Sequence, residues 1–151
     1  MANTQAIATS FKQELLQGIH AFGTSVVRGA TTADTFKAAL YLASGSLSAA
    51  TTAYSATSEV SGTNYTAGGV TVTNGNAPAT TGTTAYWTPS ASFSWNNVTL
   101  ATAFDTVLIY NSTQSNRAVA VYTFGSQTVS AGNFSLTMPS NDSSNALLRL
   151  A

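Results

Sequence analysis

The side chains that could carry chemistry are few in this chain. Its 151 residues include five Lys and Arg, five Asp and Glu, one His and no Cys. General acid–base and nucleophilic catalysis depend on titratable groups whose pKa values lie near the working pH. His20 is the only imidazole and could carry a proton. Its position directly after the apolar Ile19 favours instead a surface or interface histidine that makes one hydrogen bond.

The carboxylates do not cluster along the sequence. Asp34, Glu59, Asp105 and Asp142 stand far apart, and with one His and no Cys a zinc or copper site would need several of them together. We interpret them as solvated charges or local caps. Asp142, within S-N-D-S-S-N, fits an Asx-type turn better than a calcium loop. We therefore expect no catalytic residue, no metal site and no cofactor, and we predict that the protein is not an enzyme.

Aromatic side chains are the group with a functional alternative. They concentrate in a loop-rich middle region, where exposed rings could stack on sugars or fill the pockets of a partner. The candidate interface or ligand residues are Tyr54, Tyr65, Tyr86 and Trp87. For Trp87 a core position is an equally good interpretation. Trp95, which alternates with Phe93, is predicted to lie in the core.

The elements that must position these residues begin with an N-terminal arm over residues 1–9 and an amphipathic helix over residues 10–22. Phe11, Leu15, Ile19 and Phe22 follow a helical period. Ser10 and Gln13 form a capping-box pattern, and Gly23 is a natural stop. The remainder of a single domain, residues 10–151, is predicted to be β-rich, with a loop-rich region over residues 44–89 that holds one or two strands.

Strands are predicted wherever the apolar period changes to two. Phe36 to Leu42 reads as a half-buried strand. Similar runs bounded by Gly, Asn, Ser or Pro are Gly69–Thr73, Ala91–Trp95, Phe104–Tyr110, Arg117–Phe124, Asn133–Met138 and Ala146–Leu150. Asn111 to Asn116 is the clearest hairpin connection. About seven short strands with turn signals indicate a mainly β fold, an antiparallel β-sandwich or a small barrel, with one N-terminal helix.

Charge and composition exclude several classes of partner. The formal net charge is zero, which removes the positive surface expected of a protein that binds nucleic acid or an anionic membrane. No apolar run approaches the roughly 20 residues of a membrane span, and residues 1–10 lack the features of a secretory signal. We expect synthesis and use without export. With 25 Thr and 19 Ser, the surface suits dense packing beside other proteins.

Five segments together carry a resemblance to a known family. They are S-F-K-Q-E-L-L-Q-G-I-H-A-F (Ser10–Phe22), D-T-F-K-A-A-L-Y (Asp34–Tyr41), T-T-A-Y-S-A-T-S-E-V-S-G-T-N-Y-T-A-G-G (Thr51–Gly69), I-Y-N-S-T-Q-S-N-R-A-V-A-V (Ile109–Val121) and the terminal S-N-A-L-L-R-L. In this order, over nearly the whole chain, they resemble a family of small tailed-bacteriophage virion proteins of the capsid-decoration or tail-associated type. The resemblance implies a β-rich, non-enzymatic particle protein. In that family a His often runs directly into D-x-F-K, whereas here G-T-S-V-V-R-G-A-T-T intervenes, so no individual binding residue is carried over.

The sequence thus leads to three functional hypotheses. The first is a capsid decoration or cement protein that acts as a homo-oligomer, located in the virion, made in the bacterial cytoplasm and packed against the major capsid or tail proteins. The second is a structural protein of the tail or of the head-to-tail junction. The third is a module that binds a host glycan through the central aromatic residues.

Overall fold

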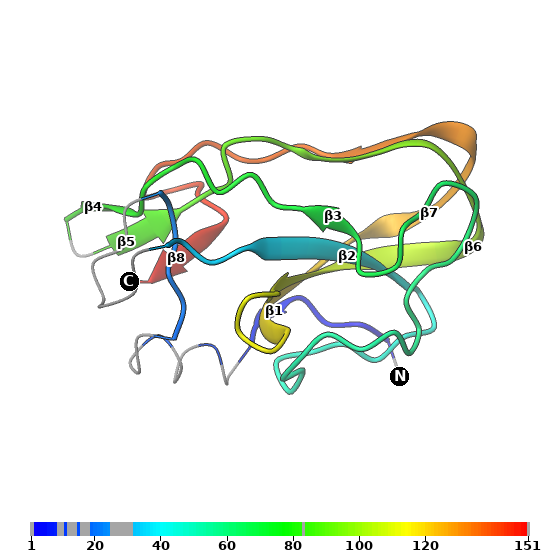
Figure 1. Ribbon diagram of the computed structural model, residues 1–151, viewed down its shortest axis with the longest axis horizontal. Coiled ribbons are helices and arrows are strands. Elements are labelled where there is room, and N and C mark those ends of the chain that lie inside the picture. The colour runs from blue at the N-terminus through cyan, green and yellow to red at the C-terminus, as the bar shows by residue number, and fades with distance from the viewer. Residues whose placement is uncertain are drawn as a thin grey trace.

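The computed structural model describes residues 2–8, 11, 15, 19–24, 32–82 and 84–150. Within them, strands make up two antiparallel sheets (Figure 1). The strands are β1 (Ala6–Ile7), β2 (Phe36–Leu42), β3 (Val70–Thr71), β4 (Ala79–Thr81), β5 (Thr84–Trp87), β6 (Phe93–Asn111), β7 (Arg117–Leu136) and β8 (Leu148–Leu150). The larger sheet has the order β1-β7-β6-β2-β3 and the smaller one the order β4-β5-β8. In Figure 1 the smaller sheet lies at one end of the larger one.

The predicted mainly β fold is confirmed, but the described strands do not close into a barrel. Two pairs of predicted strands are each continuous in the structure. Ala91–Trp95 and Phe104–Tyr110 are predicted separately and both fall in β6, while Arg117–Phe124 and Asn133–Met138 fall largely in β7. The hairpin predicted at Asn111 to Asn116 is confirmed, because it joins β6 to β7. One long hairpin therefore forms the centre of the fold.

This hairpin doubles back on itself. Phe104 pairs with Gln127 in the ladder, and Phe134 lies seven residue positions further along the strand, a step of about 23 Å in extended chain. The rings of Phe104 and Phe134 nevertheless lie 5.0 Å apart. The β6–β7 pairing shifts register at several points, and such bulges bend a ribbon. Figure 1 shows both strands turning at one end, so that their distal halves run back alongside the sheet.

β2 is buried on both faces, so its prediction as a half-buried strand is wrong. Ala39 and Tyr41, expected on the solvent side, are 0% and 1% exposed. The loop segment after β2 covers that side, where Leu42 N donates to Ser58 O and Val60 N donates to Leu40 O. A central strand with chain on both faces loses the contrast between its two sides.

The predicted helix over residues 10–22 falls mostly outside the described residues. Its described end, residues 19–22, has irregular backbone, so the helix does not extend to Phe22. The rings of Phe11 and Phe22 lie 5.9 Å apart, and Phe22 stacks on Phe36 at 4.7 Å. The described rings of Phe11 and Phe22 therefore pack together against the sheet.

The described part of the predicted N-terminal arm is docked on the sheet of its own chain. β1 pairs with Ala120 and Val121 of β7. The amide of Asn3 donates to Leu42 O at 3.0 Å and to Asp105 Oδ1 at 2.9 Å, and its Oδ1 accepts from Leu47 N. The loop-rich region over residues 44–89 contains three strands, β3, β4 and β5, where one or two are predicted.

Candidate functional site

The four predicted interface aromatics lie in two separate places. Tyr54 and Tyr65 lie beside Glu59, in the loop segment that covers the Ala39 and Tyr41 side of β2. The Tyr54 ring stacks on the Tyr110 ring at 4.8 Å, and Leu40 N of β2 donates to the Tyr65 hydroxyl at 3.0 Å. Tyr86 and Trp87 lie in β5 of the smaller sheet. The described residues therefore form no single platform from these four rings.

Glu59 is the centre of the first group. Its Oε2 accepts from the Tyr54 hydroxyl at 2.6 Å, and its Oε1 accepts from the Tyr65 hydroxyl at 2.8 Å and from Gly68 N at 2.7 Å. The neighbouring Tyr110 hydroxyl donates to Gly68 O at 2.8 Å. Bonds to a charged acceptor are stronger than neutral ones. Glu59, interpreted from sequence as a solvated charge or local cap, holds the 54–68 loop against the sheet.

The phenols around Glu59 are held in their neutral form. Burial is the main cause that raises the pKa of Tyr41, Tyr54 and Tyr65 well above the ordinary 10.0, and the nearby charge of Glu59 raises it further. The same two causes raise the pKa of Tyr110 to about 12. Phenols that hold their protons this tightly serve as hydrogen-bond donors at neutral pH, which is the role that the geometry gives them.

Trp87 occupies the core, one of the two positions that the sequence supports equally. It is 3% exposed, and its Nε1 donates to Asn76 O at 2.9 Å. Its ring lies 4.8 Å from that of Phe22. Tyr86 is half-buried beside it. Both line an apolar cavity of about 260 Å³ between β5, β8 and the 7–22 segment. Trp95, predicted in the core, is confirmed there at 3% exposed.

His20 and Asp34 are buried, which corrects their interpretation as surface groups. They are 7% and 4% exposed, and both contact Asn111 at the end of β6. The Asn111 amide donates to Asp34 Oδ2 at 2.8 Å, and its Nδ2 lies 3.1 Å from His20 Nδ1. Asp34 also accepts from Ala21 N at 3.1 Å. This polar group connects the 19–24 segment to the β6–β7 hairpin, because a buried polar side chain must find partners.

The remaining described carboxylates also hold backbone or neighbouring side chains. Asp105 accepts from Asn3 and from the Thr106 hydroxyl at 2.6 Å. Asp142 Oδ1 accepts from Ser144 N and Asn145 N, each at 2.8 Å, which confirms the predicted Asx-type turn. These bonds, with the Asn145 side chain first, lower the pKa of Asp142. Within the described ranges no three His, Asp or Glu residues gather as metal ligands.

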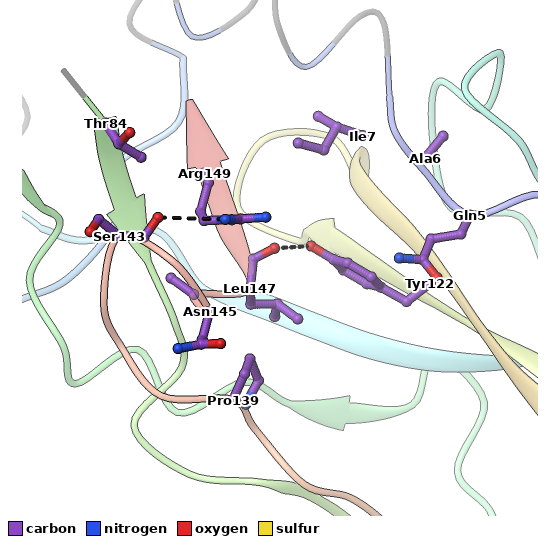
Figure 2. Close-up of a pocket in the computed structure, with 11 residues that line it drawn as sticks. Gln5, Ala6, Ile7, Thr84, Tyr122, Pro139, Ser143, Asn145, Leu147 and Arg149 are labelled. Atoms are coloured by element: carbon purple, nitrogen blue, oxygen red, sulfur yellow. Dashed lines mark hydrogen bonds between the residues drawn. The ribbon is translucent and has the colours of Figure 1, made fainter. Parts of the chain in front are cut away.

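A larger cavity, not anticipated from the sequence, lies between the two sheets' edges (Figure 2). Its volume is about 620 Å³, and it is lined by residues from β1, β5, β7, β8 and the 139–147 turn, among them Gln5, Tyr122, Pro139, Asn145, Leu147 and Arg149. The Tyr122 hydroxyl donates to Leu147 O at 2.6 Å. Arg149 is the one charged residue of the described lining. The sequence offers no signal for this cavity, because its walls come from segments far apart along the chain.

Among the described residues no helix is long and apolar enough to span a membrane. No protein family, no curated protein sequence and no solved structure matches this chain.

Proposed function

We propose that this chain is a non-enzymatic structural protein of a tailed-phage particle, which works by packing against copies of itself and against the capsid or tail proteins. Decoration of the capsid is the position that we favour. The proposal draws on the resemblance carried by the segments quoted above, which extends in order over nearly the whole chain. It also draws on how the structure uses the few ionisable groups of the chain.

The observation that carries the proposal is the role of the carboxylates. Each of the four described ones accepts hydrogen bonds that hold a segment in place: Asp34 at the 19–24 segment, Glu59 at the 54–68 loop, Asp105 at the N-terminus and Asp142 at the 142–145 turn. A general acid or base must be within reach of a substrate proton. Groups committed to the fold are poorly suited to that task.

The surface of the long hairpin supports dense association. Residues 118–141 contain no charged side chain, and most of residues 125–135 are exposed Ser, Thr, Gln, Asn, Ala or Gly. Little self-repulsion opposes contact between copies of such a surface. The doubled-back β6–β7 ribbon also supports the sandwich form of the predicted fold. Many repeated copies would make modest contacts collectively strong.

The two alternatives differ in their support. A place at the tail or head-to-tail junction uses the same surface and differs only in copy number. A glycan-binding module acting through the central aromatics has less support, because Tyr54 and Tyr65 are held at Glu59 while Trp87 is core. Tyr86→Ala on a glycan array tests that alternative, since loss of glycan binding with unchanged folding would favour it.

The test of the proposed function is absolute quantification of this chain in purified particles by mass spectrometry with isotope-labelled peptides. Decoration predicts on the order of hundreds of copies in each particle, bound through washes that remove soluble host proteins. A few dozen copies or fewer would place the chain at the tail or junction. Absence from particles, with the protein abundant in the infected cell, would refute the proposal.

A further inference from the structure

We propose that the cavity in Figure 2 binds a small ligand that carries a carboxylate together with hydroxyl groups, of the sugar-acid class. The inference does not depend on the proposed place of the chain in a particle. It rests on the size of the cavity, on the position of one guanidinium, and on the neutral polar and apolar groups around it.

The cavity has the dimensions of a small-molecule site. Its volume of about 620 Å³ lies within the roughly 300–1,000 Å³ typical of such sites. The Tyr122 ring forms part of its wall, and the hydrogen bond from the Tyr122 hydroxyl to Leu147 O at 2.6 Å fixes the ring to the residue that precedes β8. Burial raises the pKa of Tyr122 well above 10.0, so this donor stays protonated at neutral pH. That wall is therefore preformed.

Arg149 is placed to recognise a carboxylate. Within β8, Leu148 and Leu150 line the apolar cavity while Arg149, between them, lines the larger one, as the alternation of a strand requires. Its Nη1 donates to Ser144 O at 2.6 Å, which anchors one end of the guanidinium. Within the described part of the chain, Nε and Nη2 have no acceptor. Figure 2 shows the other end of the group extending away from Ser143 across the cavity.

A guanidinium anchored through Nη1 leaves the N–H donors of Nε and Nη2 for a ligand. The planar donors of Arg match the two oxygens of a carboxylate, and anchoring lowers the conformational entropy lost on binding. Asp142 works against this, because Arg149 is near enough to contribute, as the smallest cause, to the lowered pKa of that carboxyl. Its negative charge repels an incoming anion, so we expect weak binding, with a Kd on the order of 1 mM.

The remaining walls select hydroxyl groups on an apolar ring. The amides of Gln5 and Asn145 offer donors and acceptors, and the Asn145 Nδ2 is already committed to Asp142 at 3.0 Å, which leaves its Oδ1 as an acceptor. Ile7, Pro139 and Leu147 supply apolar contact. A sugar ring has C–H faces and equatorial hydroxyls, and a sugar acid adds the carboxylate for Arg149. No Asp or Glu is among the described lining residues.

The experiment compares galacturonic acid with galactose, which differ in that a carboxylate replaces the hydroxymethyl group. Each is titrated into the isotope-labelled full chain, and binding is followed by NMR shifts of the Arg149 Nε–H and of the Gln5 and Asn145 side-chain amides. We expect saturable shifts with galacturonic acid and at least ten-fold weaker binding of galactose. Arg149→Gln should remove the preference for the acid. Arg117→Gln removes the same charge outside the cavity and should change neither affinity.

Three results would overturn the proposal: no saturable shifts with the acid up to tens of millimolar, equal affinity for both sugars, or an unchanged preference in Arg149→Gln. If Arg149→Gln does not fold, Arg149→Lys keeps the charge and loses the fork, and it should weaken the acid several-fold while leaving galactose unchanged. Failure here leaves the copy number in particles unaffected, so the two proposals are tested separately.

Discussion

Single carboxylates connect segments that are distant along this chain. Glu59 joins two tyrosine hydroxyls and the Gly68 amide, and Asp34 joins the 19–24 segment to Asn111. With no Cys for disulfides and so few charges, these bonds are among the specific polar connections that hold distant segments together. Sequence reasoning treated the same residues as solvated or capping charges because their partners lie in other segments.

Glu59→Gln should lower the free energy of unfolding by about 2 kcal/mol, because an amide keeps one acceptor oxygen and forfeits the charge-assisted bonds. Urea denaturation followed by tryptophan fluorescence measures the change. Tyr54→Phe removes one of the three bonds and should cost less, about 1 kcal/mol. An unchanged midpoint in Glu59→Gln would show that the carboxylate does not hold the loop.

The raised tyrosine pKa values predict loss of stability in alkali. Unfolded phenols ionise near 10.0, whereas Tyr110 ionises at about 12 and Tyr41, Tyr54, Tyr65 and Tyr122 resist ionisation further. The folded state therefore keeps protons that the unfolded state releases. Its stability is complete below about pH 10 and falls as pH rises above that value.

Absorbance at 295 nm measures this ionisation directly. We expect these five phenols to remain largely protonated at about pH 11 while circular dichroism shows a folded protein, and to titrate near their ordinary pKa in urea. Titration of all five near 10 in the folded protein would contradict the burial and the hydrogen bonding described for them.

The strands show what the sequence can and cannot predict. Two strand predictions are correct, Phe104–Tyr110 and Arg117–Phe124, because an apolar period of two reflects which side chains of a strand are buried. The segments between predicted strands, around Asn97 and Ala131, are where β6 and β7 bulge, and both residues have positive φ. A bulge interrupts the period without ending the strand. The sequence therefore predicts two short strands in place of each long one.

In the smaller sheet only β8 has such a signal, and β4 and the cavity beside the sheet have none. β4 is Ala-Thr-Thr, which has no apolar alternation to detect. Gln5, Thr84, Tyr122 and Arg149 meet only after the chain has folded. The alternation of the predicted strand Ala146–Leu150 places Arg149 on the opposite face from Leu148 and Leu150. It does not show that this face lines a cavity, because the other walls come from distant segments.

β3 approaches β2 only because Gly69 precedes it. Gly69 has a φ of +73°, and a Cβ there would collide with the Ala38 carbonyl. Gly82 also has a positive φ, +59°, with nothing within 4 Å of a Cβ. Gly82→Ala should lower the free energy of unfolding by about 1 kcal/mol, because only the backbone conformation is strained. Gly69→Ala adds steric overlap with the Ala38 carbonyl and should lower the free energy of unfolding by at least about 3 kcal/mol. Equal losses in urea denaturation would show that β2 and β3 are not packed this closely.

Within the described residues, the outer edge of β7 beyond Val121 has no paired strand and no charged side chain. Nearer the hairpin this edge is covered, because β1 pairs with Ala120 and Val121, Ala8 N donates to Val119 O and Ala118 N donates to Thr52 O, and no charged residue follows Arg117 until Asp142. Charged side chains usually prevent a strand of another molecule from pairing with an exposed sheet edge. Here the register shifts along β6–β7 twist the edge, and a twisted edge also hinders pairing with another strand. We therefore expect association through faces and loops of the folded subunit, without exchange of strands.

We propose that this protein functions by packing against its neighbours in a particle. The most direct test of this proposal is co-sedimentation of the purified full chain with particles that lack it, with bound copies counted by quantitative mass spectrometry. We expect saturation at a fixed, symmetry-related number of copies, little affected by salt, because the contacts involve neutral groups. No saturable binding to shells or tails at any concentration, from a protein that sediments only as a monomer, would contradict it.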